Sequence, residues 1–209
     1  MSRLRCGLYA VTDDRRGDAL LDLAAALLRG GAVLLQYRAK DVSVKQRREE
    51  SLALLGLCRV HGVPLIINDD LALAAAITAD GVHLGRDDAS LAEARAALGA
   101  HAIIGVSCYA DLECARVAAA GGADYVAFGS IFPSPTKPEA TRAPLTLLSQ
   151  ARRELTLPVC AIGGINLDNA GAVLEAGGDL LAVINDLAEA PDPEARAAAY
   201  RALFIPPGA

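Results

Sequence analysis

The chain has 209 residues, 53% of them hydrophobic and only 4% aromatic, which predicts one large or two small domains with an aliphatic core. The net charge of −5 argues against nucleic acid or an anionic membrane as the main partner, although basic residues can still gather around a small anion. The five cysteines lack C-x-x-C spacing, which favours reduced, buried thiols. Because the sequence shows neither a signal-peptide core nor an apolar run of about 20 residues, we expect a cytoplasmic protein.

Short apolar runs alternate with longer segments of helical periodicity along the chain. Most of these runs are continuous rather than alternating in polarity, as expected of strands that are covered on both faces. The predicted strands are Gly7–Val11, Val33–Tyr37, Pro64–Ile67, Gly81–Leu84, Ile103–Val106, Tyr125–Gly129, Val159–Ile162 and Leu180–Ile184. Between them, Ser43 with Gln46 and Ser90 with Glu93 have the spacing of capping boxes at helix starts.

Eight strand-then-helix units in 209 residues predict an α/β fold, a (β/α)₈ TIM barrel that forms a single domain over residues 1–209. An open, doubly wound sheet is the alternative, but it usually carries fewer parallel strands at this length. The proline-rich stretch 133–144 is predicted to be a long functional loop within the barrel. In this fold the active site lies at the carboxyl ends of the strands.

Acidic residues follow two consecutive predicted strands. Asn68, Asp69 and Asp70 come after the third strand, and Asp87 and Asp88 come after the fourth. If these strands are neighbours in a parallel sheet, their carboxylates converge at one rim, where they can hold a hard cation such as Mg²⁺. Alternatively, Asp70 and Asp87 start the following helices as caps.

Basic residues follow the second predicted strand. Side chains alternate along an extended chain, so Gln36, Arg38 and Lys40 share one face, which suits a phosphate or diphosphate. Ser107, after the fifth strand, either donates a hydrogen bond to a ligand or caps a helix. His83, inside the fourth strand, is interpreted as a structural histidine with satisfied hydrogen bonds.

The predicted loop after the sixth strand carries hydroxyls and a lysine between prolines. Ser134, Thr136 and Lys137 can hold an anion there, and Lys137 is alternatively a Schiff-base residue or a surface lysine. After the seventh strand, Gly163-Gly164 opens a helix and allows a phosphate to approach the backbone. These patterns indicate a phosphorylated ligand without defining a reaction.

Taken in order, the motifs resemble the thiamine-phosphate synthase family. They are Gln36-Tyr37-Arg38-x-Lys40, Ile66-Ile67-Asn68-Asp69-Asp70, Ala79-Asp80-Gly81-Val82-His83-Leu84-Gly85, Gly105-Val106-Ser107, Pro133-x-x-Thr136-Lys137 and Ala161-Ile162-Gly163-Gly164-Ile165. The resemblance runs from Gly7 to about Asp186. It implies a (β/α)₈ transferase of thiamine biosynthesis that joins hydroxymethylpyrimidine diphosphate to a thiazole phosphate, with release of pyrophosphate.

The resemblance also implies roles for individual residues. Catalysis would involve Lys137, Arg38 and Ser107, and one Mg²⁺ would be held by Asp69 and Asp88. The pyrimidine diphosphate would contact Gln36, Tyr37, Arg38, Ala39, Lys40, Asn68, Ser107 and Lys137. The thiazole phosphate would contact Ser134, Pro135, Thr136, Gly164, Ile184 and Asn185. The sequence departs from the family pattern at Ala39, Arg86, Ser134 and Asn185, none of which is a predicted metal ligand.

Three other functions remain as alternatives. A thiazole tautomerase shares the fold and the thiazole-phosphate site but needs an acid–base residue in place of a metal-bound diphosphate. A Schiff-base aldolase would use Lys137, and a non-enzymatic phosphate sensor would leave the acid pairs unused. The expected partners are the small-molecule substrates, not nucleic acid or a membrane. The sequence does not fix the oligomeric state and leaves a homo-oligomer open.

Overall fold

A computed structural model describes residues 4–133 and 142–205 of the chain. Within these residues, eight parallel strands close into a barrel in which β1 pairs with both β2 and β8. The strands are β1 (Gly7–Val11), β2 (Leu34–Tyr37), β3 (Leu65–Asn68), β4 (Gly81–Leu84), β5 (Ile103–Tyr109), β6 (Tyr125–Phe128), β7 (Val159–Ile162) and β8 (Leu180–Val183). The predicted (β/α)₈ barrel is confirmed.

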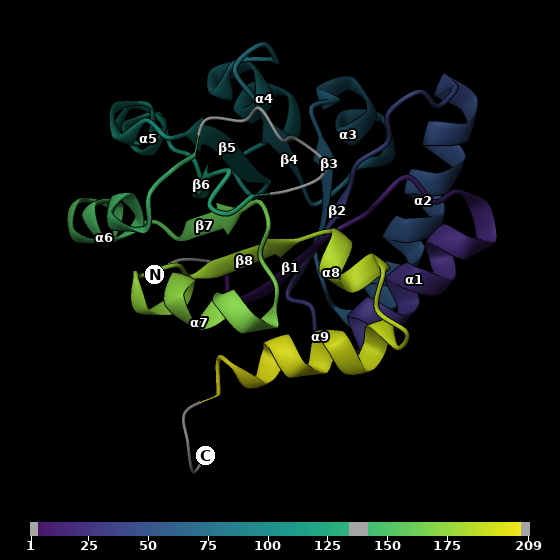
Figure 1. The fold of residues 1–209 in the computed structure, drawn as a ribbon. Coiled ribbons are helices and arrows are strands. Elements are labelled where there is room, and N and C mark those ends of the chain that lie inside the picture. Colours follow the sequence, from purple (N-terminus) through teal and green to yellow (C-terminus); the bar gives the residue numbers. More distant parts are fainter. Residues whose placement is uncertain (1–3, 134–141, 206–209) are drawn as a thin grey trace.

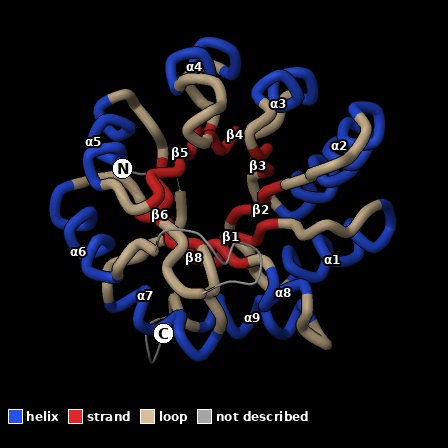
Figure 2. The backbone as a smooth tube through the Cα atoms, turned by 45° about the horizontal axis from the view of Figure 1, so that its top comes forward, coloured by secondary structure: helices blue, strands red, loops and turns tan. Residues whose placement is uncertain are grey.

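Helices surround the strands as an outer ring (Figure 2). They are α1 (Gly17–Arg29), α2 (Val44–His61), α3 (Leu71–Ile77), α4 (Leu91–Leu98), α5 (Leu112–Ala120), α6 (Leu145–Glu154), α7 (Leu167–Glu175), α8 (Asn185–Ala188) and α9 (Pro193–Ala202). The short helix α8 follows β8 directly, and α9 packs beside α1 (Figure 1). None of the helices in the described part of the chain is long and apolar enough to cross a membrane.

The strand boundaries differ from the predictions by one residue at most, except in β5. This strand continues to Tyr109, and its register with β6 shifts between Ser107 and Tyr109. Such a bulge turns side chains away from their regular alternation. Tyr109 has a φ of 53°, in the left-handed region that non-glycine residues rarely occupy. The irregular end of β5 therefore sets where Ser107 lies.

The helix starts follow the capping signals in the sequence with one exception. Ser90 and Glu93 form a reciprocal capping box at α4, as their spacing predicts. At α2, Ser43 accepts a hydrogen bond from the Gln46 N–H, but the Gln46 side chain donates to Glu50 at 3.0 Å instead of returning to Ser43. Only half of that box forms, because Glu50 provides a stronger, charged acceptor.

The core has two layers, one inside the barrel and one between the strands and the helices. In β1, Tyr9 and Val11 belong to the inner layer, whereas Leu8 and Ala10 belong to the outer layer. This alternation follows from the period of two along a strand. It divides the residues near the strand ends into those that reach the pocket and those that pack under the helices.

All five cysteines are free thiols. Cys58, Cys108 and Cys160 are buried, as the sequence predicts, but Cys6 is exposed and Cys114 is half-buried. Cys6 differs because it precedes β1, where the chain has not yet entered the barrel.

Candidate functional site

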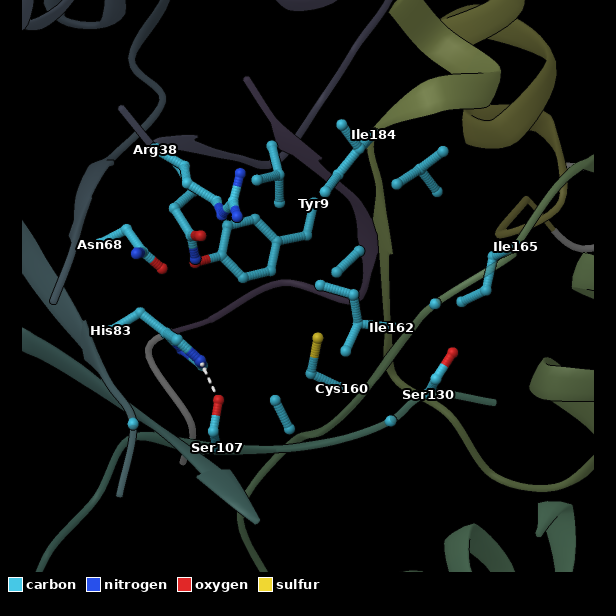
Figure 3. A pocket seen from close by; sticks show the side chains of 18 of the residues that line it. Tyr9, Arg38, Asn68, His83, Ser107, Ser130, Cys160, Ile162, Ile165 and Ile184 are labelled. Carbon is cyan, nitrogen blue, oxygen red and sulfur yellow. Dashed lines mark hydrogen bonds between the residues drawn. The ribbon is translucent and has the colours of Figure 1, made fainter. Parts of the chain in front are cut away.

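A cavity of about 1030 Å³ opens at the carboxyl ends of the strands. This is the end of a TIM barrel where ligands bind. Most of the predicted site residues that the structure describes line it: Gln36, Arg38, Lys40, Asn68, Asp69, Asp88, Ser107, Gly164, Ile184 and Asn185. Figure 3 shows Arg38, Asn68, His83 and Ser107 on one side of this pocket, and Ile162, Ile165 and Ile184 on the other.

Arg38 and Lys40 form one side of the pocket, which we call the basic side. Thr12, a buried residue just after β1, fixes the backbone of this side by hydrogen bonds. The Arg38 N–H donates to the Thr12 Oγ1 at 2.9 Å, and the Thr12 hydroxyl donates to the Arg38 carbonyl at 3.2 Å. The Arg16 guanidinium donates to the Lys40 carbonyl at 2.9 Å. These contacts continue the extended chain beyond β2, so that Gln36, Arg38 and Lys40 all line the cavity.

The intervening residues, Tyr37 and Ala39, have side chains in the outer layer. The Tyr37 hydroxyl donates to Glu50 at 2.7 Å, and Ala39 packs against the apolar cluster beneath the helices. The alternation that brings Arg38 into the pocket turns its two neighbours away. The structure therefore does not bring these two side chains to the cavity, although the resemblance includes both residues in the pyrimidine-diphosphate site.

Two carboxyl groups meet at the ends of the neighbouring strands β3 and β4. Burial, together with the neighbouring Asp88 carboxyl, raises the pKa of Asp69 to about 6. Asp88 also accepts a hydrogen bond from the Gly85 N–H at 2.6 Å. The Asp69 carboxyl is therefore harder to ionise beside Asp88 than in water.

The other member of each acid pair has a different environment. Asp70 caps α3 by accepting from the Leu73 N–H at 2.9 Å, and it also pairs with Arg47 at 3.2 Å. This is the helix-cap alternative that the sequence left open for Asp70. Asp87 is exposed at the rim of the cavity, and Ser90, rather than Asp87, caps α4. Asp87 is therefore not a helix cap.

The donor set suits Mg²⁺. No group of three or more His, Cys, Asp or Glu residues in the described ranges is arranged to hold a metal ion. Mg²⁺ does not need such a group, because it commonly takes one or two carboxylates and fills its remaining positions with water and substrate phosphates. Asp69 and Asp88 supply two carboxylates beside an open cavity, and a divalent cation would offset the unfavourable closeness of their charges.

Ser107 lies beside His83 in the pocket. The His83 Nε2 and the Ser107 Oγ are 2.8 Å apart, and the His83 Nδ1 is 2.8 Å from the Tyr125 hydroxyl (Figure 3). Burial lowers the pKa of His83 to about 4, so its ring is neutral near pH 7. Both ring nitrogens are satisfied, in agreement with the structural interpretation, yet the residue also lines the cavity.

The opposite side of the pocket is formed by the loops after β6, β7 and β8. The Phe132 N–H donates to the Gly163 carbonyl at 2.9 Å, which joins two of these loops. Gly164 has a φ of 63° and lies so close to Phe132 and Pro133 that no Cβ would fit. Ser134, Pro135, Thr136 and Lys137, four of the predicted contacts, lie outside the described residues.

Several lining residues carried no signal in the motif analysis. Tyr9 and Cys160 face the cavity from inside the barrel, and Ser130 lies beside the Gly163 loop. Strand alternation alone could have found Tyr9, since it shares the inner face of β1 with Val11. Arg86 lies at the rim with its guanidinium 4.8 Å from the centre of the Tyr109 ring.

The fold and the pocket define an enzyme-like (β/α)₈ barrel with its ligand cavity at the carboxyl ends of the strands. The family model described as Thiamine monophosphate synthase (TMP-TENI) matches residues 8–187, and the chain belongs to this family. It is accordingly an enzyme of the transferase class. The resemblance drawn from the motifs is confirmed.

Relatives match over nearly their whole length. The chain is 60% identical to a thiamine-phosphate synthase of Azoarcus sp. (strain BH72), covering 95% of this chain and 97% of that protein. It is 55% identical to a thiamine-phosphate synthase of Thioalkalivibrio sulfidiphilus, over 97% and 96% of the two chains. The structure of a thiamine phosphate pyrophosphorylase from Pyrococcus furiosus superimposes with a TM-score of 0.85 at 34% identity, over 95% of each chain.

Proposed function

We propose that this enzyme joins hydroxymethylpyrimidine diphosphate to a thiazole phosphate, or to its carboxylated form, and releases pyrophosphate. The names of the relatives support thiamine phosphate as the product. The observation that carries the proposal is the meeting of Arg38 and Lys40 with the acid pair Asp69 and Asp88 in one cavity. Two cations beside two carboxylates suit a diphosphate that is bound partly by side chains and partly through Mg²⁺.

The reaction needs no nucleophile from the protein. The bond between the pyrimidine methylene carbon and the diphosphate oxygen breaks, and its electron pair leaves with pyrophosphate. The thiazole nitrogen supplies the lone pair for the new carbon–nitrogen bond. The aminopyrimidine ring can delocalise positive charge on the methylene carbon, so we propose a dissociative displacement. The protein must bind both rings, stabilise the departing charge and exclude water.

As the bond breaks, negative charge develops on the oxygens of the leaving pyrophosphate, which would lie near the basic side of the pocket. Arg38 and Lys40 would hold the diphosphate there, and Lys137 would add a third cation. Mg²⁺, when bound by Asp69 and Asp88, would supply further charge neutralisation for the leaving pyrophosphate. Asn68 and Ser107 would orient the pyrimidine. Charge stabilisation of this kind acts mainly in the transition state, because the leaving group becomes more negative as the bond breaks.

The thiazole phosphate would enter from the side of the cavity formed by the loops after β6, β7 and β8, which we call the glycine side. Gly164, Ile184 and Asn185 line this side, and the missing side chain at Gly164 lets the loops after β6 and β7 pack closely together there. We place Ser134, Pro135 and Thr136 at the same phosphate on the strength of the resemblance. The two substrates would then meet between the basic side and the glycine side, with the thiazole nitrogen facing the methylene carbon.

A reaction assay tests this proposal. The protein is incubated with both substrates, with each one alone, and with both plus EDTA, and thiamine phosphate is measured. We expect product only with both substrates and a divalent metal. A failure to form product with any divalent metal would exclude the proposed reaction. Conversion of a thiazole isomer without pyrophosphate release would instead support the tautomerase alternative.

A further inference from the structure

A continuous line of hydrogen bonds crosses the floor of the pocket. The Gln36 Nε2 donates to the Tyr9 hydroxyl at 2.6 Å, and the Tyr9 and Tyr125 hydroxyls are 2.7 Å apart. The Tyr125 hydroxyl lies 2.8 Å from the His83 Nδ1, and the His83 Nε2 lies 2.8 Å from the Ser107 Oγ. Five strands contribute one residue each, so the line connects opposite parts of the barrel.

Each member of this line has one hydrogen to give to its neighbour. Tyr9 is 1% exposed, Tyr125 is 0% exposed and His83 is 8% exposed. Burial raises the pKa of both tyrosine hydroxyls, so near pH 7 the phenols keep their protons. A neutral imidazole has one N–H donor and one acceptor nitrogen. Buried groups of this kind require matched donors and acceptors, since an unmatched one is costly.

The Gln36 amide, at one end of the line, determines which partner donates in each of the following hydrogen bonds. Because the Gln36 N–H can only donate, Tyr9 accepts at that side, and among the described contacts Tyr125 is the acceptor within reach of the Tyr9 hydrogen. Tyr125 then gives its hydrogen to the His83 Nδ1, which must be the unprotonated nitrogen. The imidazole hydrogen therefore sits on Nε2 and is donated to Ser107. The hydroxyl hydrogen of Ser107 is left to point elsewhere, and Ser107 lines the cavity.

We propose that Tyr9, Tyr125 and His83 are positioning residues that hold Ser107 as a hydrogen-bond donor toward the ligand. At the other end of the line, the Gln36 carbonyl oxygen remains available as an acceptor. A hydroxyl donor and an amide acceptor at opposite ends of the pocket floor fit a ring that carries an acceptor nitrogen on the side facing Ser107 and an amino group on the side facing Gln36. This inference rests on the proposed function for its ligand, an aminopyrimidine, but the hydrogen-bond direction itself does not depend on any ligand.

The packing of the barrel interior keeps the line in place. The Tyr9 and Tyr125 rings meet edge to face with centres 5.7 Å apart, and His83 stacks on Tyr125 with centres 5.6 Å apart. Gly105 is the register partner of Tyr125 in the neighbouring strand, and a Cβ at Gly105 would collide with the Tyr125 ring. The sequence thus provides space for the Tyr125 ring at Gly105, where a side chain would displace it.

The first test measures the tautomer of His83 in the free protein. Nitrogen-15 NMR of histidine-labelled protein near pH 7 separates protonated from unprotonated ring nitrogens. The signals of the exposed His61 and His101 are identified by replacing each with Gln. We expect His83 to be neutral with its hydrogen on Nε2. A hydrogen on Nδ1, or an even mixture of the two tautomers, would overturn the proposed direction.

The second test removes single hydroxyls from buried tyrosines. Tyr125→Phe should shift the His83 tautomer toward a mixture and raise the KM for the pyrimidine diphosphate about tenfold, without changing the KM for the thiazole phosphate. Tyr200→Phe is the matched control, because the Tyr200 hydroxyl is also buried but donates to Asp186 outside this line. The control should leave the His83 tautomer unchanged.

The outcomes separate this inference from the proposed function. A Tyr125→Phe protein with an unchanged His83 tautomer, or with an unchanged KM for the pyrimidine diphosphate, would contradict the positioning role. If the wild-type enzyme makes no thiamine phosphate, the proposed function fails, whereas the tautomer in the free protein still decides the direction of the hydrogen bonds. If Tyr125→Phe fails to fold, the wild-type spectrum decides that direction alone.

Discussion

The carboxyl groups of Asp69 and Asp88 lie close enough together, beyond the ends of two neighbouring strands, for Asp88 to raise the pKa of Asp69. Such a contact is unfavourable when both groups are ionised, and it resolves either by sharing a proton or by binding a cation. Asp70 and Asp87, the sequence neighbours of this pair, are engaged differently, one as a helix cap and one at the exposed rim. The two acid doublets of the sequence therefore contribute one residue each to a single carboxylate pair.

The first prediction concerns this pair. Asp69→Asn and Asp88→Asn should each raise the Mg²⁺ concentration needed for half-maximal activity by about tenfold to a hundredfold, because each removes a charged ligand. Asp87→Asn is the matched control, since the exposed Asp87 carboxylate of the same loop makes no hydrogen bond or ion pair with Asp69 or Asp88 in the described structure, and its Mg²⁺ dependence should equal that of the wild type. A Mg²⁺ titration in which all three variants behave alike would rule out the pair as the metal site.

A second prediction concerns Lys137. If its ammonium group stabilises the departing pyrophosphate, Lys137→Ala should lose about 3 kcal/mol or more of transition-state stabilisation, about a hundredfold or more in kcat. Lys45→Ala is a suitable control, because Lys45 lies on α2 and pairs with Glu49 at the surface. Treatment of the wild type with borohydride and substrate should give no covalent adduct. Trapping of an adduct on Lys137 would support the aldolase alternative instead.

The third prediction compares two glycine substitutions. Gly105→Ala should lower the free energy of unfolding by about 2 kcal/mol, because the new methyl group would force the buried Tyr125 ring to move. Gly56→Ala, within α2, meets no neighbouring atoms and should raise that free energy by about 0.5–1 kcal/mol. Urea unfolding measures both. Equal effects at the two positions would show that the ring does not need the space at Gly105.

The fourth prediction concerns pH and Glu50. Burial opposes ionisation of this carboxyl, but hydrogen bonds from Tyr37, the Gly17 N–H and Gln46 outweigh it and lower its pKa. A lowered native pKa stabilises the folded state above the ordinary glutamate pKa, and this contribution disappears as the pH falls through the native pKa. The difference in unfolding free energy between the wild type and Glu50→Gln should therefore shrink from about pH 6 to about pH 3. A difference independent of pH would contradict this account.

The sequence predicted the barrel well, because most strands are continuous apolar runs and the segments between them have helical periodicity. The same pattern could not predict the end of β5, where the register shift at Ser107 depends on pairing with β6. Period-two alternation correctly grouped Gln36, Arg38 and Lys40 on the pocket side. Applied consistently, it also turns the Tyr37 and Ala39 side chains away, whereas the family resemblance includes both residues.

The floor of the pocket was the part least accessible from sequence. The hydrogen-bond partners of His83, Tyr125 and Ser107, lie on other strands, 42 and 24 positions away in the chain. No sequence motif links His83 to either of them, so these contacts could not be inferred from the sequence. Tyr9 and Tyr125 are 116 positions apart, and only closure of the barrel brings their hydroxyls together. Local patterns identify residues at strand ends, whereas contacts across the barrel interior depend on the tertiary fold.

The central claim is that this enzyme couples loss of pyrophosphate to attack by the thiazole nitrogen, with Mg²⁺ at the carboxylate pair. The most direct measurement follows pyrophosphate and thiamine phosphate together in one reaction, with the thiazole phosphate and Mg²⁺ each added or omitted. We expect the two products to appear in equal amounts, and only when both substrates and Mg²⁺ are present. Pyrophosphate release at the same rate without the thiazole phosphate, or product formation unaffected by EDTA, would contradict the claim.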